Sequence, residues 1–139
     1  MIAEVFLDTN VLIYAGSAAP ADAAKRRAAQ KLIENTRFGL SAQVLQEYIF
    51  SALRKKWLGI SEANISTTLE LAGKVTVLPI TLPLILIAMD IRRRHQVSHR
   101  DSTIIAAAQE LGCKTLYSED LSDAQHYDGV KVLNPFRAL

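Results

Sequence analysis

Cysteine is nearly absent from the sequence, because Cys113 is the only one in 139 residues. A single cysteine excludes an internal disulfide and a zinc site built from several thiolates, so we expect Cys113 to be a small core residue in a cytoplasmic protein. Long apolar runs are also absent. The longest, residues 80–89, contains Thr81 and Pro83 and is too short for a bilayer span of about 20 residues. The start lacks the basic and apolar stretches of a secretory signal.

Strong net charge and flexible linkers are missing as well. The net charge is +2, half of the residues are apolar, and 22% are charged, which is typical of a globular protein. No repeat or linker divides the chain, so we expect one domain over residues 1–139. Basic residues cluster at 25–27, 54–56 and 92–95. Such clusters either hold phosphates or form solvated helix faces, and composition does not decide between the two.

Short β-like runs alternate with longer helical patterns along the chain. We predict extended segments at residues 2–7, 38–40, 74–78, 114–117 and 130–133. We predict helices at residues 9–15, 21–34, 42–56, 62–72, 82–94 and 99–111. This alternation predicts an α/β fold in three layers, with a mostly parallel central sheet flanked by helices. Ligands in such folds bind beyond the carboxyl ends of the strands, so acidic residues at these ends are candidates for a site.

Two aspartates follow predicted strands. Asp8 comes directly after the first strand, and Asp120 comes shortly after the strand at 114–117. A structural role is the alternative for each, since aspartate is common at helix N-caps and in turns. Glu119 and Asp123 remain alternatives to Asp120 at this position.

Two further acids lie beside apolar helix faces. Asp101 shares a face with Ile104 and Ile105 in the first turn of a helix that we expect Ser98 to cap. Burying a carboxylate costs several kcal/mol unless it is compensated, so Asp101 either completes a capping box or faces a cation. Glu47 borders the apolar stripe of the helix at 42–56 and is otherwise a surface glutamate.

Convergence of Asp8, Glu47, Asp101 and Asp120 would create a site for a cation, because gathered carboxylates repel one another. Ligation by oxygen alone favours Mg²⁺ or Mn²⁺ over Zn²⁺. The three histidines have no metal-binding spacing, and we interpret them as surface residues.

The segments that carry these acids resemble the PIN-domain ribonucleases, and in particular the VapC-type toxins of type II toxin–antitoxin systems. The resemblance spans nearly the whole chain and lies in Phe6-Leu-Asp-Thr-Asn-Val-Leu-Ile13, Gln46-Glu-Tyr48, Asp101-Ser-Thr-Ile-Ile-Ala-Ala-Ala108, Leu116-Tyr-Ser-Glu-Asp-Leu121 and Gly129-Val-Lys-Val-Leu-Asn-Pro-Phe136.

The resemblance implies a Mg²⁺- or Mn²⁺-dependent endoribonuclease, a homodimer and a cognate antitoxin that blocks the site. It assigns catalysis and metal binding to the same four carboxylates, with Asn10 and Ser118 in support. One position differs, because an aromatic residue often precedes the third acid in such toxins, whereas Arg100 does so here.

RNA binding needs cations near the carboxylates, and Arg54 and Arg100 are the candidates that we select. No aromatic stacking platform is evident, so Trp57 and Tyr48 are interpreted as core or dimer contacts.

Other enzyme classes fit less well. A phosphotransferase of the haloacid-dehalogenase type needs an aspartate where Asn10 stands, and a receiver domain needs one after the strand at 74–78. A non-catalytic PIN-like module that binds RNA or protein remains the main alternative.

Overall fold

A mostly parallel sheet forms the centre of the computed structural model, which describes residues 2–139. Its strands are β1 (Val5–Leu7), β2 (Phe38–Ser41), β3 (Thr76–Leu78), β4 (Thr115–Tyr117), β5 (His126–Tyr127) and β6 (Val130–Leu133). The strand order is β3-β2-β1-β4-β6-β5, and every neighbouring pair is parallel except β5 with β6. Strand β1 therefore lies in the middle of the sheet, between β2 and β4.

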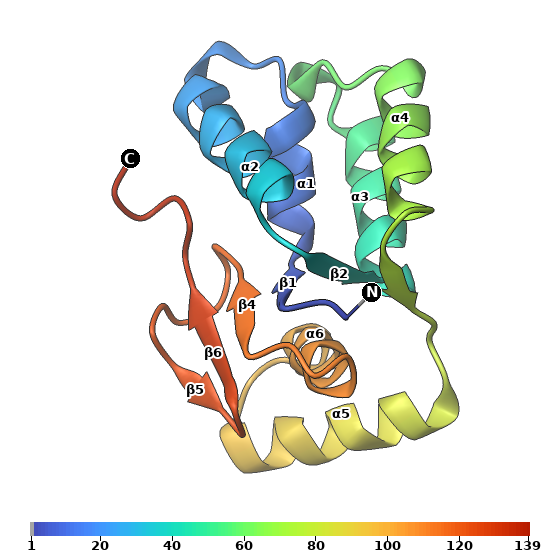
Figure 1. Cartoon of the computed structure of the whole chain (residues 1–139), viewed down its shortest axis with the longest axis vertical. Helices are drawn as coiled ribbons and strands as arrows, with labels where there is room; N and C mark the ends of the chain where they lie inside the picture. Colours follow the sequence, from blue (N-terminus) through green and yellow to red (C-terminus); the bar gives the residue numbers. More distant parts are fainter. Residues whose placement is uncertain (1) are drawn as a thin grey trace.

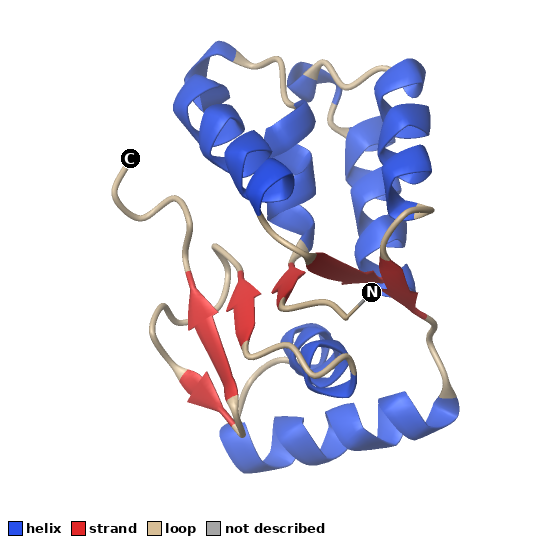
Figure 2. Cartoon of the chain, viewed as in Figure 1, coloured by secondary structure: helices blue, strands red, loops and turns tan. Residues whose placement is uncertain are grey.

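Helices flank the sheet on two sides. They are α1 (Thr9–Gly16), α2 (Ala23–Asn35), α3 (Ala42–Arg54), α4 (Glu62–Ala72), α5 (Leu82–His95) and α6 (His99–Glu110). Figures 1 and 2 show α1 to α4 on one side of the strands and α5 and α6 on the other. Helix α6 packs on β2, β4 and β6, and α5 packs on α6. This arrangement confirms the predicted α/β fold.

Helix starts follow the capping residues of the sequence. Ser41, Thr81 and Ser98 each accept a hydrogen bond from the backbone N–H three residues ahead, as expected for N-caps. The predicted helix at 42–56 ends earlier, at Arg54, and is followed by a short 3₁₀ turn at Lys56–Leu58.

Strand ends were harder to predict than helix starts. The first strand begins at Val5 rather than Ile2, and the third begins at Thr76 rather than Lys74. The two-residue strand β5 was missed, because so short a pairing leaves no periodic pattern in the sequence.

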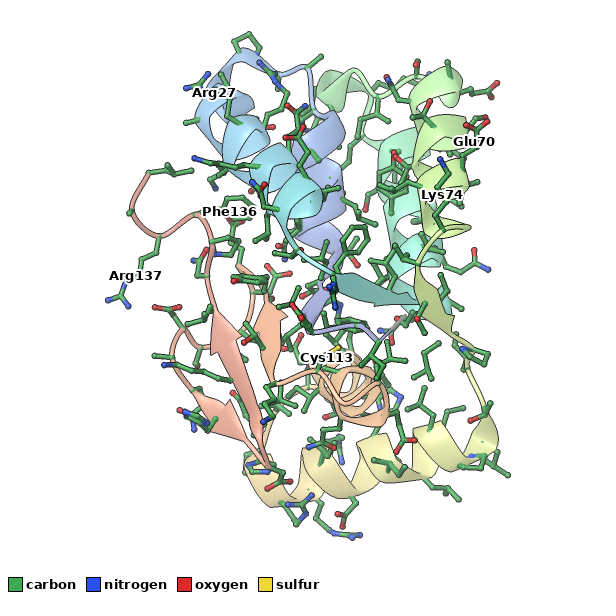
Figure 3. All side chains as sticks on the ribbon, viewed as in Figure 1. Arg27, Glu70, Lys74, Cys113, Phe136 and Arg137 are labelled. Carbon is green, nitrogen blue, oxygen red and sulfur yellow. The ribbon has the colours of Figure 1, made fainter. Side chains whose placement is uncertain are left out.

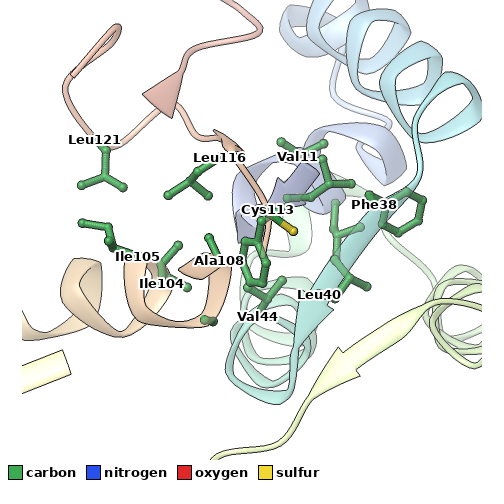
Figure 4. Close-up of a cluster of buried hydrophobic side chains, with 14 of the residues drawn as sticks. Val11, Phe38, Leu40, Val44, Ile104, Ile105, Ala108, Cys113, Leu116 and Leu121 are labelled. Atoms are coloured by element: carbon green, nitrogen blue, oxygen red, sulfur yellow. The ribbon is translucent and has the colours of Figure 1, made fainter. Parts of the chain in front are cut away.

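The core covers both faces of the sheet, with side chains of α1 and α3 on one side and of α6 on the other. Figure 4 shows Ile104, Ile105 and Leu116 among the buried side chains of this core, and all three are fully buried. Cys113 points into the interior in Figure 3 and is buried, which confirms the prediction of a core cysteine. Burial raises the pKa of its thiol to about 11, so the unreactive thiol form dominates at neutral pH. Across residues 2–139, every helix is too short or too polar to cross a bilayer.

The sheet register brings together the segments that follow β1 and β4, which carry Asp8 and Asp120. Leu7 pairs with Tyr117 at the carboxyl ends of β1 and β4, and the backbone N–H of Asp8 donates to the carbonyl of Tyr117 at 3.0 Å. The residues immediately after these two strands are therefore neighbours, as the sequence predicts for adjacent parallel strands.

Candidate active site

Asp8 lies at the centre of the candidate site and is fully buried. Its Oδ1 accepts the backbone N–H of Thr9 at 2.7 Å, and its Oδ2 accepts the hydroxyl of Ser118 at 2.7 Å. Asp8 therefore caps α1, as the structural alternative proposed. The same carboxylate also faces the other acids, so the capping role and a role in the site coexist.

Asp120 joins this centre through two polar side chains. The Oγ of Ser118 accepts the backbone N–H of Asp120 at 3.1 Å, while Asn10 Nδ2 donates to Asp120 Oδ2 at 3.2 Å. Asn10 Oδ1 also accepts the backbone N–H of Glu119 at 3.3 Å. Ser118 and Asn10 thus position the turn that carries Asp120.

The two alternatives to Asp120 are engaged elsewhere. Glu119 accepts the hydroxyl of Tyr14 at 2.7 Å and pairs with Lys25 at 2.8 Å. Asp123 accepts the backbone N–H of Asn134 at 2.7 Å and pairs with Arg137. Among Glu119, Asp120 and Asp123, the one whose contacts lead to Asp8 is Asp120.

Glu47 reaches the site from α3. Its Oε1 accepts the hydroxyl of Thr9 at 2.8 Å, and its Oε2 accepts the amide of Gln43 at 3.3 Å. Thr9 was not selected from the sequence as a site residue. Its position between the two candidate residues Asp8 and Asn10, just after a buried strand, was the signal available.

The side chain of Arg100 brings the four acids together. It extends from the first turn of α6, beside Asp101, and is 33% exposed. Its Nη2 lies 2.8 Å from Asp8 Oδ1 and 2.7 Å from Glu47 Oε1. Its Nη1 lies 3.3 Å from Asp101 Oδ1 and 4.0 Å from Asp120 Oδ2. One guanidinium therefore contacts the carboxylate of its neighbour Asp101 and those of three remote segments of the chain.

These contacts shift the protonation equilibria of the cluster. Burial opposes the charge of Glu47, but hydrogen bonds from Arg100 and Thr9 outweigh burial and hold the pKa of this carboxyl below its usual range. Burial also opposes the charge of Arg100, yet Asp8 and Glu47 raise the pKa of the guanidinium further above its usual value. Burial and the charge of Asp8 raise the pKa of Asp120. The cluster joins four carboxyl groups to one guanidinium, so acidic groups outnumber basic ones.

The donor set suits a hard divalent cation, although Arg100 fills the centre of the cluster. Carboxylate and hydroxyl oxygens surround one position that already attracts a positive group, which is the ligand chemistry of Mg²⁺ and Mn²⁺. With the guanidinium in this place, no three Asp, Glu, His or Cys side chains within residues 2–139 are close enough to enclose a metal ion. The residues fit the ion in their chemistry, and Arg100 separates them.

A cavity of about 670 Å³ opens from the carboxylates toward the end of α3. Glu47, Arg100 and Asp120 line one part of it, and Phe50, Lys55 and Trp57 line another. Arg54, a predicted substrate contact, instead lies over the ring of Phe50 at 5.4 Å, and the cation in the lining at this end is Lys55. Tyr48 is a core residue as expected, whereas Trp57 is 70% exposed and does not belong to the core.

Fold and site together define a class of protein, namely an α/β protein with an acidic cluster at the carboxyl ends of its central parallel strands. Sequence comparison gives the family. The PIN-domain family model matches residues 5–128, so the chain belongs to the PIN-domain family.

Solved structures of similar fold include a toxin–antitoxin complex and a toxin. A toxin–antitoxin complex from Klebsiella pneumoniae matches with a TM-score of 0.69 and 19% identity, covering 95% of this chain and 98% of that chain. The VapC20 toxin of Mycobacterium tuberculosis, which cleaves the sarcin–ricin loop, matches with a TM-score of 0.67 and 24% identity over 84% and 89% of the two chains. FitAcB from Neisseria gonorrhoeae matches with a TM-score of 0.66 and 21% identity over 96% and 99%. No curated protein matches the sequence.

Replacing Ser118 by alanine tests the link between Asp8 and Asp120. The change removes the hydroxyl that donates to Asp8 Oδ2 and accepts the backbone N–H of Asp120. Because the lost group is buried and hydrogen-bonded at both ends, we expect the free energy of unfolding to fall by about 1–2 kcal/mol. Urea denaturation measures this value. The matched control is Ser51→Ala on α3, and an equal loss in both variants would contradict a special role for Ser118.

Proposed function

We propose that the chain is a cytoplasmic metal-dependent endoribonuclease that cleaves RNA phosphodiesters as the toxin of a toxin–antitoxin pair. The observation that carries this proposal is the convergence of four carboxylates on one cationic position at the carboxyl ends of β1 and β4. Membership of the PIN-domain family and the fold shared with VapC toxins support it.

Asp8, Glu47, Asp101 and Asp120 are the residues that would hold one or two Mg²⁺ or Mn²⁺ ions and thereby carry the catalysis. When bound, the ion would supply a water of lowered pKa and offset the charge of the phosphate. Attack by this water would form the new P–O bond and break the bond to the 3′-oxygen, which would take up a proton, so that 5′-phosphate and 3′-hydroxyl ends would result. Asn10 and Ser118 contribute by fixing Asp120 and Asp8.

Basic residues are required beside such an acidic cluster, because carboxylates alone repel RNA. Arg100 is placed to contact a phosphate at the cluster itself. Lys55 lines the same cavity some distance along it and offers a second phosphate contact. Arg54 stays a weaker candidate, since it lies over Phe50 at the edge of this region.

Two protein partners belong to the proposal. The first is a cognate antitoxin that blocks the site, which is supported by the toxin–antitoxin complex of similar fold from Klebsiella pneumoniae. The second is another copy of the chain in a homodimer. Helix α5 supports this assembly, because Leu82, Leu86 and Met89 are exposed on it, and exposed apolar patches mark interaction sites.

Metal removal and metal addition test the proposed activity directly. We expect the purified protein to cleave RNA in Mg²⁺ or Mn²⁺, to stop in excess EDTA, and to leave 5′-phosphate ends that a phosphate-dependent exonuclease degrades. We also expect Mn²⁺ to raise the melting temperature, because an ion that binds the folded state at 100 times its Kd stabilises it by about 2.7 kcal/mol.

A control variant away from the site and an RNA-binding measurement complete this test. Asp90→Asn changes an exposed acid of α5 that pairs with Arg93 and Arg94 and should leave cleavage unchanged. RNA binding without cleavage in any divalent ion, and without stabilisation by Mn²⁺, would instead establish a non-catalytic RNA-binding module.

A further inference from the structure

Arg100 holds a position that no other cation shares. Among the residues that the structure describes, it is the one Lys, Arg or His that pairs with Asp8, Glu47, Asp101 or Asp120. Its Nη2 also lies 3.3 Å from the hydroxyl of Thr9. Since gathered carboxylates repel one another, this guanidinium offsets their repulsion.

The guanidinium and a divalent cation need the same oxygen atoms. Nη2 lies between Asp8 Oδ1 and Glu47 Oε1, at 2.8 and 2.7 Å. An ion held by these two carboxylates would occupy the space of Nη2, and the two positive charges would repel each other at such short range. Binding of the guanidinium and binding of the ion at this position therefore exclude each other.

The surroundings give the Arg100 side chain room to leave. It is anchored on the first turn of α6 and borders the cavity of about 670 Å³ on one side and a second cavity of about 290 Å³ on the other. Leu84 and Ile85 line the smaller cavity, which suits a guanidinium poorly. The larger cavity is polar near Asn10 and Gln46 and suits the displaced side chain better.

We propose that Arg100 is a built-in counter-ion that occupies the metal position and must be displaced before a divalent cation binds. Arg100 therefore acts as a positioning residue that keeps the carboxylates assembled and sets the metal concentration at which the site fills. This inference rests on the proposed function, because it takes the carboxylates as the metal ligands.

Metal affinity measured without RNA tests the inference. We expect Arg100→Gln to bind Mn²⁺ at least tenfold more tightly than the unchanged protein in isothermal titration calorimetry, because the competing cation is gone. The matched control is Arg93→Gln, which removes a guanidinium that is 76% exposed and paired with Asp90 on α5. Its Kd should equal that of the unchanged protein. Equal or weaker binding by Arg100→Gln would overturn the inference.

A second measurement uses the unchanged protein, in case Arg100→Gln fails to fold. Nε of Arg100 donates to Glu47 Oε2 at 3.3 Å, so its ¹⁵N–H signal should exchange slowly with water in the absence of metal. We expect Mg²⁺ titration to convert this signal to the fast exchange of an exposed arginine. A protected signal at Mg²⁺ saturation would overturn the inference and leave the proposed function intact. Absence of metal binding in the unchanged protein and in Arg100→Gln would overturn the inference and the proposed function together.

Discussion

Asp8→Asn is expected to reduce RNA cleavage about a thousandfold or more while the protein stays folded. The Asp8 carboxylate is fully buried and contacts Arg100, Ser118 and the start of α1, so it lies at the centre of the proposed metal site. Asparagine keeps the shape and removes the charge. Metal ions supply several kcal/mol of stabilisation to phosphoryl transfer, and each 1.36 kcal/mol corresponds to a tenfold change in rate.

The folded state should survive the change because asparagine can still accept the backbone N–H of Thr9. We expect a loss of about 1–3 kcal/mol in the free energy of unfolding, since the new amide meets the guanidinium of Arg100. Single-turnover cleavage of a labelled RNA measures the rate, and circular dichroism confirms the fold. Asp90→Asn serves as the matched control on α5. Cleavage at the unchanged rate by a nuclease-free preparation of Asp8→Asn would refute the proposed site.

The fold was accessible from the sequence because its signals are local. Ser41 and Ser98 mark helix starts, and Asp8 comes directly after a short buried strand. Neighbouring parallel strands end at the same edge of a sheet, so the meeting of Asp8 with the segment around Ser118 results from the order of elements alone. The registers themselves, and the two-residue strand β5, depend on long-range pairing that no local pattern carries.

The meeting of the acids was predictable, and Arg100 was selected as a cation near them, but its pairing with all four acids was not predicted. The positions of Glu47 on α3 and Asp101 on α6 indicate which faces they occupy. The direction of the long Arg100 side chain does not follow from its position on the helix. It has many rotamers, and the charges around it in three dimensions decide which of them it adopts. A sequence pattern gives the position of its Cα, and the folded surroundings decide where the guanidinium lies. Helix geometry places Arg54 on the same side of α3 as Glu47, and its contact with Phe50, which lines the same cavity as Glu47, agrees with that side while leaving its role in substrate binding a prediction.

The packing of α6 couples the core to the site, and Ile105→Ala is the second change with a large expected effect. Ile105 is fully buried and lies near Leu121 in Figure 4, one turn beyond Asp101 on the same helix. Truncating a buried isoleucine removes apolar contacts and leaves a cavity, which costs about 2–5 kcal/mol. We expect the melting temperature to fall by roughly 10 °C, because each kcal/mol corresponds to about 4 °C at this chain length.

Metal affinity should weaken together with stability in this variant, because α6 carries both Asp101 and Arg100 and is held against the sheet by Ile104 and Ile105. Leu53→Ala on α3 is the matched control, since Leu53 is 54% exposed and its truncation should change the free energy of unfolding by less than about 0.5 kcal/mol. Thermal unfolding with and without Mn²⁺ measures both effects. Equal melting temperatures for Ile105→Ala and Leu53→Ala would show that α6 is not anchored by its buried isoleucines, and the carboxylates would then be held together by their ion pairs with Arg100 rather than by the core.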